Sequence, residues 1–355
     1  MLWLGESDDS SGWLLTRRGC AHGTIAMHEE RRDMPTADKV AKLWNAAMPV
    51  RLPGRLLSEV AAHADDIRDA LTIMQRVRND ESCADILLEE PYRSRLEPDF
   101  DLLAPIHSGH DAQEIEKIAF DAVKSGELHA EDLWMKVSCL SFHDSDDSIR
   151  FRFSYGMEMF KDQEHDPLRE ELAAELATRV FPECTMISAH RELCGLLSGL
   201  LGYAPLFVER LIYSNAPGGG AQLHQDVETG HAGVVYAQLF GHTGWLALPR
   251  SELLDEIAGF LAASEIPEFA ELRTMPQDAL ITLLESDDQG TLETLLNSTP
   301  AFTRRLIEHG HGLVLAPGDI LLLPQQSTEH CCWHSVFCLD DEPGHSLSFA
   351  IKHPA

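Results

Sequence analysis

A succession of short β-type segments after residue 205 constrains the fold more than any other feature of the sequence. The segments are rich in leucine, β-branched and aromatic residues, and Gly, Pro or Asn residues separate them. They span residues 206–214, 221–226, 233–240, 244–249, 312–316, 319–324, 331–338 and 346–352. Short strands in such a series, with turn residues between them, are typical of a β-barrel or β-sandwich. We therefore predict a β core built from the C-terminal part of an α+β chain.

Helical segments flank this predicted core. Residues 250–310 separate the fourth predicted strand from the fifth, and they carry apolar residues at helical spacing, such as Leu254, Ile257 and Leu261. We therefore expect a helical insertion at this point of a domain that spans residues 205–355. The preceding region, residues 34–204, is expected to be mainly helical, with one or two strands that support the core.

Two local signals within residues 34–204 are specific. Asp166 is a helix-capping residue, and Pro167 follows it where the first helical position would be. The helix predicted after it has a buried stripe made of Leu168, Leu172, Leu176 and Val180. Residues 149–154 alternate isoleucine or phenylalanine with arginine or serine, which predicts a strand with one buried face.

The net charge of the chain is −30, from 28 Lys and Arg against 58 Asp and Glu. Such a charge repels nucleic-acid phosphates and anionic lipid surfaces, so we expect neither partner. The eight cysteines contain no CxxC pair, and no apolar stretch has the length of a membrane-spanning helix. These features predict a cytoplasmic protein with reduced thiols. Residues 1–33 are expected to be a disordered tail, or an extension upstream of a start at Met27 or Met34.

The clearest chemical motif is His224-Gln225-Asp226, in the second predicted strand. Residues i and i+2 of a strand point to the same side, so this imidazole and carboxylate could bind one metal ion together. Pro217 and the three glycines after it give a flexible turn just before the motif. A motif this short also arises by chance, and the alternative interpretation is an exposed ion pair on a strand.

A third ligand is expected from a distant strand. His334 lies inside the segment 331–338, next to Trp333, whereas His330 precedes that segment and could be a loop residue. We therefore predict that His224, Asp226 and His334 are the metal ligands and the catalytic residues, with His330 as the rival third ligand. Two histidines and one carboxylate are typical of non-heme Fe(II) sites, because they leave positions open for O₂ and a co-substrate.

The segment from about 206 to 352 resembles the JmjC and cupin-like Fe(II)/2-oxoglutarate oxygenases, including the asparaginyl hydroxylase type. The matching pieces, in the order that the family requires, are HQD at 224–226, YAQLFGHTGWLALP at 236–249, GDILLLP at 318–324, WHSV at 333–336 and SLSFAIK at 346–352. The resemblance implies a double-stranded β-helix, which is a jelly-roll or cupin-like barrel. It also implies Fe(II), 2-oxoglutarate as co-substrate, and O₂.

The resemblance further implies a residue that binds the distal carboxylate of 2-oxoglutarate. The family often has a lysine where this chain has Thr243, so either a different cation serves or the co-substrate binds in a different position. The candidates for that cation are Lys352, Arg210, Arg150 and Arg152. By strand parity, the residues expected to line the co-substrate pocket together with Thr243 and Lys352 are Tyr213, Tyr236, Gln238 and Ser348.

These expectations describe a Fe(II)/2-oxoglutarate-dependent dioxygenase. We expect it to hydroxylate, desaturate or cyclise a small molecule such as an amino acid or a specialised metabolite, because the chain has no reader module and no basic tail. Three alternatives stay open: a protein side-chain hydroxylase of the JmjC type, an iron-dependent oxygenase or oxidase that does not use 2-oxoglutarate, and a non-enzymatic barrel. Helices outside the barrel could also supply the contacts of a homodimer.

Overall fold

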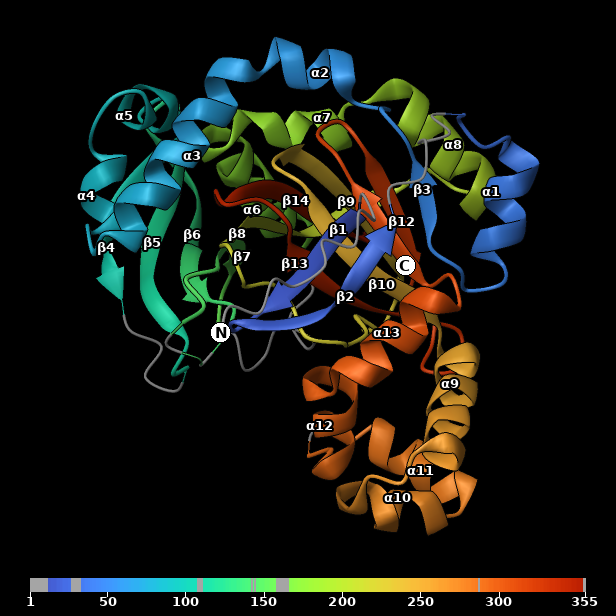
Figure 1. Ribbon diagram of the computed structural model, residues 1–355. Helices are drawn as coiled ribbons and strands as arrows, with labels where there is room; N and C mark the ends of the chain where they lie inside the picture. The colour runs from blue at the N-terminus through green and yellow to red at the C-terminus, as the bar shows by residue number, and fades with distance from the viewer. Residues whose placement is uncertain are drawn as a thin grey trace.

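The computed structural model describes residues 12–26, 33–106, 111–141, 143, 145–157, 166–286 and 288–353. Every pair of strands in these ranges is antiparallel. Helices pack around the sheets, so the chain is an α+β protein (Figure 1). None of the helices in the described ranges combines the length and the apolar character that crossing a membrane would require.

The largest element is a sheet of nine strands. In spatial order its strands are β3 (Val50–Leu52), β12 (Ile320–Pro324), β9 (His231–Phe240), β14 (Gly344–Lys352), β8 (Leu206–Asn215), β7 (Ile149–Tyr155), β6 (Glu127–Cys139), β5 (Glu114–Lys124) and β4 (Phe100–Ile106). The strand predicted at 149–154 is confirmed as β7, and it pairs directly with β8. The N-terminal region therefore continues the same sheet as the predicted core strands.

The expectation that residues 34–204 are mainly helical is wrong for β4, β5 and β6. In β5 the buried side chains of Ile118, Phe120 and Ala122 alternate with the partly exposed Ala119 and Asp121. Several of the other positions in β5 and β6 hold Ala, Glu or Lys, which have good helix propensity and weak strand propensity. β5 and β6 have partner strands on both sides and β4 has one on its β5 side, and the local sequence does not show those partners.

A second sheet of three strands faces one half of the large sheet. Its strands are β11 (Gly312–Leu315), β10 (Thr243–Pro249) and β13 (Cys332–Cys338). A hydrophobic cluster joins the two sheets, with Val234 and Tyr236 of β9 on one side and Trp245 of β10 on the other. Among the described residues, hydrogen bonding does not connect the two sheets into a closed barrel, and the double-stranded β-helix stays a prediction.

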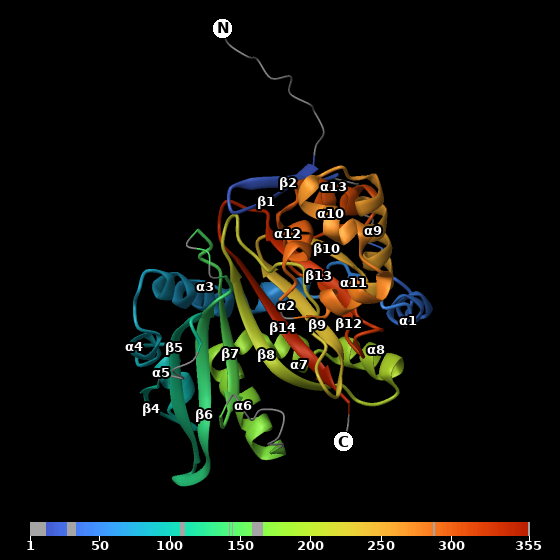
Figure 2. The same cartoon turned by 90° about the horizontal axis from the view of Figure 1, so that it is seen from below.

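The opposite face of the large sheet is covered by helices from the N-terminal region (Figure 2). The elements are α1 (Ala37–Trp44), α2 (Leu57–Ala62), α3 (Ala64–Arg78), α4 (Cys83–Leu87), α5 (Tyr92–Leu96), α6 (Pro167–Val180), the 3₁₀ turn η2 (Pro182–Cys184), α7 (Thr185–Ser188) and α8 (Arg191–Leu201). The predicted start of α6 is confirmed, because the Asp166 side chain accepts hydrogen bonds from two N–H groups of its first turn. Leu168 is 50% exposed, so its predicted place in the buried stripe is wrong.

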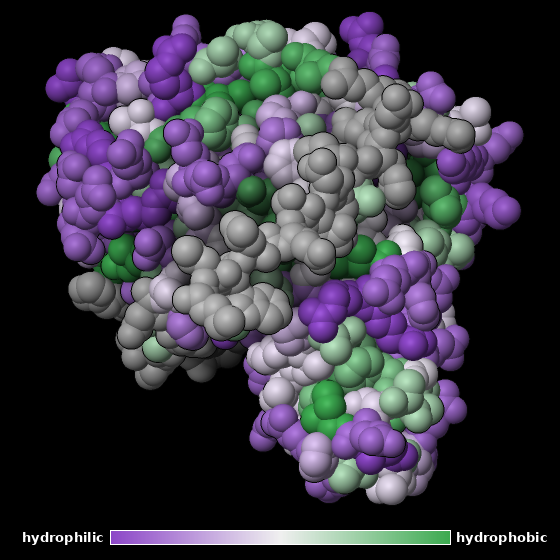
Figure 3. Space-filling model, in the orientation of Figure 1, coloured by the Kyte–Doolittle hydropathy of each residue, from purple (hydrophilic) through white to green (hydrophobic). Residues whose placement is uncertain are grey.

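Residues 250–308, within the range 250–310 expected as a helical insertion, hold a group of helices that projects away from the sheets (Figure 1). The elements are α9 (Arg250–Ala263), the 3₁₀ turn η3 (Pro267–Phe269), α10 (Ala270–Thr274), α11 (Gln277–Leu284), α12 (Thr291–Ser298) and α13 (Pro300–Glu308). They share a hydrophobic cluster with the outer side of the small sheet. Figure 3 shows hydrophilic side chains over much of the visible surface, as the charge of the chain leads one to expect.

The predicted disordered tail is wrong for residues 12–26, which form a hairpin of β1 (Gly12–Arg17) and β2 (Cys20–Ala26). The rest of the predicted tail, apart from residue 33, lies outside the described residues. The hairpin packs on β13 and α13 (Figure 2), and Leu15 is fully buried in the same cluster as the insertion. Trp13, Leu15 and Arg17 alternate toward the small sheet, so a tertiary surface stabilises a hairpin that would be marginal in isolation.

Candidate metal centre

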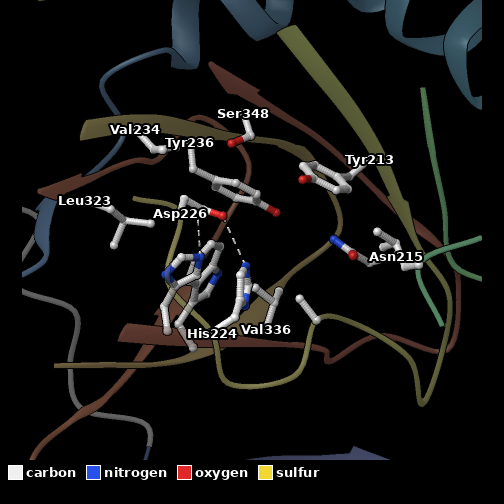
Figure 4. Close-up of a pocket in the computed structure, with 13 residues that line it drawn as sticks. Tyr213, Asn215, His224, Asp226, Val234, Tyr236, Leu323, Val336 and Ser348 are labelled. Atoms are coloured by element: carbon white, nitrogen blue, oxygen red, sulfur yellow. Dashed lines mark ion pairs between the residues drawn. The ribbon is translucent and has the colours of Figure 1, made fainter. Parts of the chain in front are cut away.

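His224, Asp226 and His334 form one cluster in the space between the two sheets. Each residue offers one ligand atom, and these three atoms lie within 4.8 Å of one another. The two carboxylate oxygens of Asp226 are each 3.4 Å from an imidazole Nε2, one from His224 and the other from His334 (Figure 4). The described part of the chain thus brings together the three residues predicted as ligands, and the rival His330 is not in the group.

The backbone explains why two residues so distant in sequence meet. His224 and His334 form an isolated antiparallel bridge in which each N–H donates to the other's carbonyl, at 2.9 Å and 2.8 Å. Residues directly opposite each other in such a pair project to the same side, so both imidazoles point into the same space. The predicted strand 221–226 is otherwise wrong, because only His224 of that segment has a ladder partner.

Both histidines present the same nitrogen to the cluster. The Nδ1 of His224 is 2.7 Å from the carbonyl oxygen of Gln222, and the Nδ1 of His334 is 3.3 Å from that of Cys332. A carbonyl oxygen can only accept, so each Nδ1 carries the hydrogen and each Nε2 keeps a free lone pair toward Asp226. Metal-binding histidines are oriented in this way. The donor set therefore fits a divalent transition metal such as Fe(II).

The charges in the cluster favour an ionised Asp226 and a neutral His334, whereas His224 must lose its proton to a metal. Burial opposes ionisation of Asp226, yet the two facing imidazoles hold the pKa of its carboxyl well below the usual range. Burial opposes the charge of His224 as well, but Asp226 raises the pKa of that imidazole. Burial and the neighbouring His224 lower the pKa of His334. An ionised carboxylate beside a neutral imidazole is what metal ligation requires.

The cluster lies at one side of a pocket with a volume of about 410 Å³, open solvent included. The pocket has hydroxyl and amide groups from Tyr213, Asn215, Tyr236 and Ser348 on the large sheet (Figure 4). Apolar side chains complete its lining: Leu140, Ala221, Val234, Trp245, Leu323 and Val336. The side chains of His224 and Asp226 are 41% and 38% exposed, whereas that of His334 is 5% exposed. The cluster is therefore open to solvent on the side of the HxD motif.

The residues predicted to bind the co-substrate divide into two groups. Tyr213, Tyr236 and Ser348 line the pocket. Gln238 and Thr243 do not line it and are fully buried behind it. The Oε1 of Gln238 accepts hydrogen bonds from the hydroxyls of Tyr236, at 3.0 Å, and Thr243, at 2.8 Å. These two residues therefore support the pocket wall.

Three of the four cations predicted to replace the family lysine have partners elsewhere. Lys352 pairs with Glu170 of α6, and Arg210 donates to the carbonyl of Ala174 on the same helix. Arg152 pairs with Glu209 at 2.9 Å.

Arg150 is different from these three cations. It lies directly opposite Tyr213 across the β7–β8 ladder, and its buried Nε has no hydrogen-bond partner. Within the described ranges, however, the lining of the pocket includes no lysine or arginine.

Two residues that touch the metal-ligand segments were missed by sequence reasoning. Arg17 of β1 donates hydrogen bonds to the carbonyls of Ala221 and Val336. Asn297 of α12 accepts one from the N–H of Leu223. Neither residue belongs to a motif, so no signal in the sequence connected them with the cluster. Asn215 was also missed, although strand parity with Tyr213 would have indicated it.

A second group, made of Glu209, Glu228 and His231, also brings three ligand atoms within 4.8 Å of one another. Arg152 already forms an ion pair with Glu209, so a cation of the protein itself compensates part of its charge. The group therefore does not require a metal.

No known family model matches the chain, and no curated protein sequence matches it. Among solved structures, it is similar to an oxidoreductase of the 2OG-Fe(II) oxygenase family from Burkholderia pseudomallei. The two share 11% sequence identity with a TM-score of 0.32, over 91% of this chain and 93% of the other. A likeness this distant leaves the function to be inferred from the site itself.

Proposed function

We propose that the chain is a non-heme Fe(II)- and 2-oxoglutarate-dependent oxygenase that oxidises a small molecule. The observation that carries the proposal is the convergence of two imidazole Nε2 atoms and one carboxylate on one point beside a pocket. Such a set would hold Fe(II) from one side and leave its other positions open. Bound Fe(II) would supply the activation of O₂, which amino-acid side chains do not perform.

The protein's own groups would then orient the reactants and exclude water. The hydroxyl and amide groups of Tyr213, Asn215 and Ser348 are suited to hydrogen-bond the oxygen atoms of a co-substrate or substrate. Apolar neighbours such as Val234 and Leu323 limit the access of water to the same space. The pocket combines a few polar groups with a largely apolar lining, as small-molecule sites do, which favours a small substrate over a protein side chain.

For the distal carboxylate of 2-oxoglutarate we propose Arg150. Directly opposite residues of an antiparallel pair share one face, so Arg150 lies on the same sheet face as Tyr213 of the pocket. Its buried Nε lacks a partner. The Nε of Arg210 does too, but Nη1 of Arg210 donates to Ala174, and Lys352 and Arg152 each form an ion pair. A guanidinium can grip a carboxylate with two parallel hydrogen bonds.

A second candidate function is an iron-dependent oxygenase that does not use 2-oxoglutarate. The observation that favours it is the absence of lysine and arginine from the pocket lining in the described part of the chain. A co-substrate with two carboxylates would then have hydroxyl and amide partners at its distal end, without a compensating charge.

Anaerobic titration separates these functions. Fe(II) is added to the purified chain first, and 2-oxoglutarate second, while the visible absorption is recorded. Iron binding followed by a weak charge-transfer band supports the proposal. Iron binding without a band supports the second candidate, and a chain that binds no iron would contradict both functions and favour a non-enzymatic barrel. Asp226→Ala removes the only carboxylate of the cluster, so it should abolish iron binding in either enzyme.

The role of Arg150 is tested in the same titration. Arg150→Met should raise the 2-oxoglutarate concentration that gives half of the band about 10- to 100-fold, because a charged hydrogen bond contributes about 1.5–3 kcal/mol. Arg152→Met is the matched control on the same strand, since the guanidinium of Arg152 already pairs with Glu209. Equal behaviour of the two variants would remove Arg150 from the co-substrate site.

A further inference from the structure

We infer that Arg17 of the N-terminal hairpin is a positioning residue of the metal centre. Its guanidinium ties together the two chain segments that carry the ligands, and this sets how tightly the metal is bound. The inference rests on the proposed function to the extent that the cluster binds a metal. It adds that residues far outside the β core determine the geometry of the site.

The contacts of Arg17 are specific to the two ligand segments. Its Nη2 donates to the carbonyl of Ala221 at 2.7 Å and to the carbonyl of Val336 at 2.8 Å. Ala221 lies three residues before His224, and Val336 lies two residues after His334. The N–H of Val336 also donates to the carbonyl of Ala221, at 2.9 Å. One nitrogen of one side chain thus joins the segments close to both histidines.

The segment before His224 needs such support because it is not part of a regular strand. Residues 216–223 have no ladder partner among the described strands, so other groups must satisfy their backbone. The guanidinium of Arg17 donates to the carbonyl of Ala221, and the backbone N–H of Arg18 donates to the carbonyl of Gly218. The hairpin therefore holds this segment at two points on the approach to the HxD motif.

The two segments are in close contact, so a shift of one displaces the other. A Cβ placed on Gly220 would lie only 2.3 Å from the carbonyl oxygen of Val336. Arg17 lies beside this contact, with its Cζ 3.9 Å from the centre of the Phe337 ring.

Burying the guanidinium of Arg17 costs desolvation free energy, which an apolar side chain at the same position would not cost. The residue is 4% exposed, and its buried Nε has no hydrogen-bond partner. An apolar side chain at this point could cover Phe337 but could not join the two carbonyls. We therefore attribute the presence of an arginine at this buried position to its hydrogen bonds with the carbonyls of Ala221 and Val336.

The hairpin packs against the small sheet through other residues of β1, and these contacts hold the backbone of Arg17 in position. Leu15 is fully buried, and a Cβ added to Gly244 of β10 would lie 2.5 Å from its Cδ2. Trp13 stacks on the imidazole of His242, with ring centres 4.8 Å apart. These contacts attach β1 to the small sheet that also carries His334.

Titration of the full-length apoprotein with Co(II), a spectroscopic probe of the metal site, tests the inference. Arg17→Met keeps the aliphatic stem and removes the donors, and we expect a 10- to 100-fold rise in the Kd for Co(II), the effect typical of groups that orient metal ligands. Arg17→Lys can place one nitrogen between the two carbonyls and should recover most of the affinity. Arg18→Met is the matched control and should stay within about twofold of the wild type, because the side chain of Arg18 contacts Ser141 and neither ligand segment.

The visible spectrum of bound Co(II) distinguishes positioning from general stability, because it reports ligand geometry. We expect altered bands in Arg17→Met under conditions where its circular dichroism matches the wild type. An unchanged Kd and spectrum in that variant would overturn the inference. If Arg17→Met does not fold, Arg17→Gln takes its place, and failure of both to fold would assign Arg17 to global stability instead. A wild-type chain that binds no Co(II) would contradict the proposed function, and that result differs from all of the others.

Discussion

Acidification is expected to weaken the protein through His22 of the hairpin. His22 is 3% exposed, its Nδ1 is 3.4 Å from the hydroxyl of Thr303, and its ring centre is 5.7 Å from that of Phe337. Burial, and then the charges of Arg17 and Arg304, lower the pKa of His22 from 6.5 to about 4. The folded protein therefore keeps this imidazole neutral at pH values where the unfolded chain protonates it.

The sign and the size of the effect follow from this difference in pKa. Between pH 6.5 and about 4 the unfolded chain binds more protons than the folded one, so the free energy of unfolding falls as the pH falls. Above pH 6.5 the imidazole is neutral in both states, and His22 makes no contribution to pH dependence. Since each tenfold change in proton affinity is worth about 1.4 kcal/mol, the loss at the acidic end is at most about 3 kcal/mol.

Urea unfolding of the wild type and of His22→Gln, followed by circular dichroism from neutral to acidic pH, measures this loss. Glutamine cannot be protonated, but its amide can still hydrogen-bond Thr303. The difference between the two proteins isolates His22, because the carboxylates titrate in both. We expect that difference to move by about 2–3 kcal/mol in favour of the variant between neutral pH and pH 4. Curves that stay parallel would refute the reasoning.

Of three further predictions, two concern the candidate metal site and its surroundings, and the third concerns a buried polar pair away from it. Fe(II) at about 100 times its Kd should raise the free energy of unfolding by about 2.7 kcal/mol in anaerobic urea titrations of the wild type, and should leave Asp226→Ala unchanged. Gly220→Ala should lower this free energy by about 1–3 kcal/mol, because the new Cβ meets the Val336 carbonyl at φ +120. The control Gly199→Ala, in a helix with nothing within 4 Å, should be neutral or slightly stabilising. Glu183→Ala should cost about 1–3 kcal/mol in the same assay, because the fully buried imidazole of His345, 2.8 Å away, loses its hydrogen-bond partner; a cost below about 0.5 kcal/mol would contradict that interpretation.

The strands of the β core could be predicted well from the sequence, with the exception of the segment around the HxD motif. Segments such as 233–240 and 319–324 show their strand character locally, through residue type and bounding turns. Residues 221–226 have a similar composition, but their partners in the structure are the side chains of Arg17 and Asn297 and the backbone of β13. No local pattern distinguishes such a segment from a strand.

The residues predicted to bind the co-substrate were likewise predicted only in part. Parity placed Tyr236 and Ser348 correctly on the pocket side of neighbouring strands, because alternation is a property of any strand. Parity also selected Gln238, and the family resemblance selected Thr243. Both are buried behind the pocket, where the hydroxyl of Thr243 donates to Gln238. Which residues of one face reach the cavity depends on what packs against that face.

The sequence by itself determined the chemical identity of the candidate ligands, the start of α6 and most of the core strands. These features depend on residue types and on spacings of a few residues, which are the range of backbone propensity and capping. The tertiary structure alone decided that His334 meets His224, that β7 brings Arg150 opposite Tyr213, and that the hairpin of residues 12–26 packs against the segments that carry the candidate ligands. Those outcomes depend on contacts between segments far apart in the chain, whose free energy comes from shared burial and from backbone pairing that exist only after the sheets have assembled.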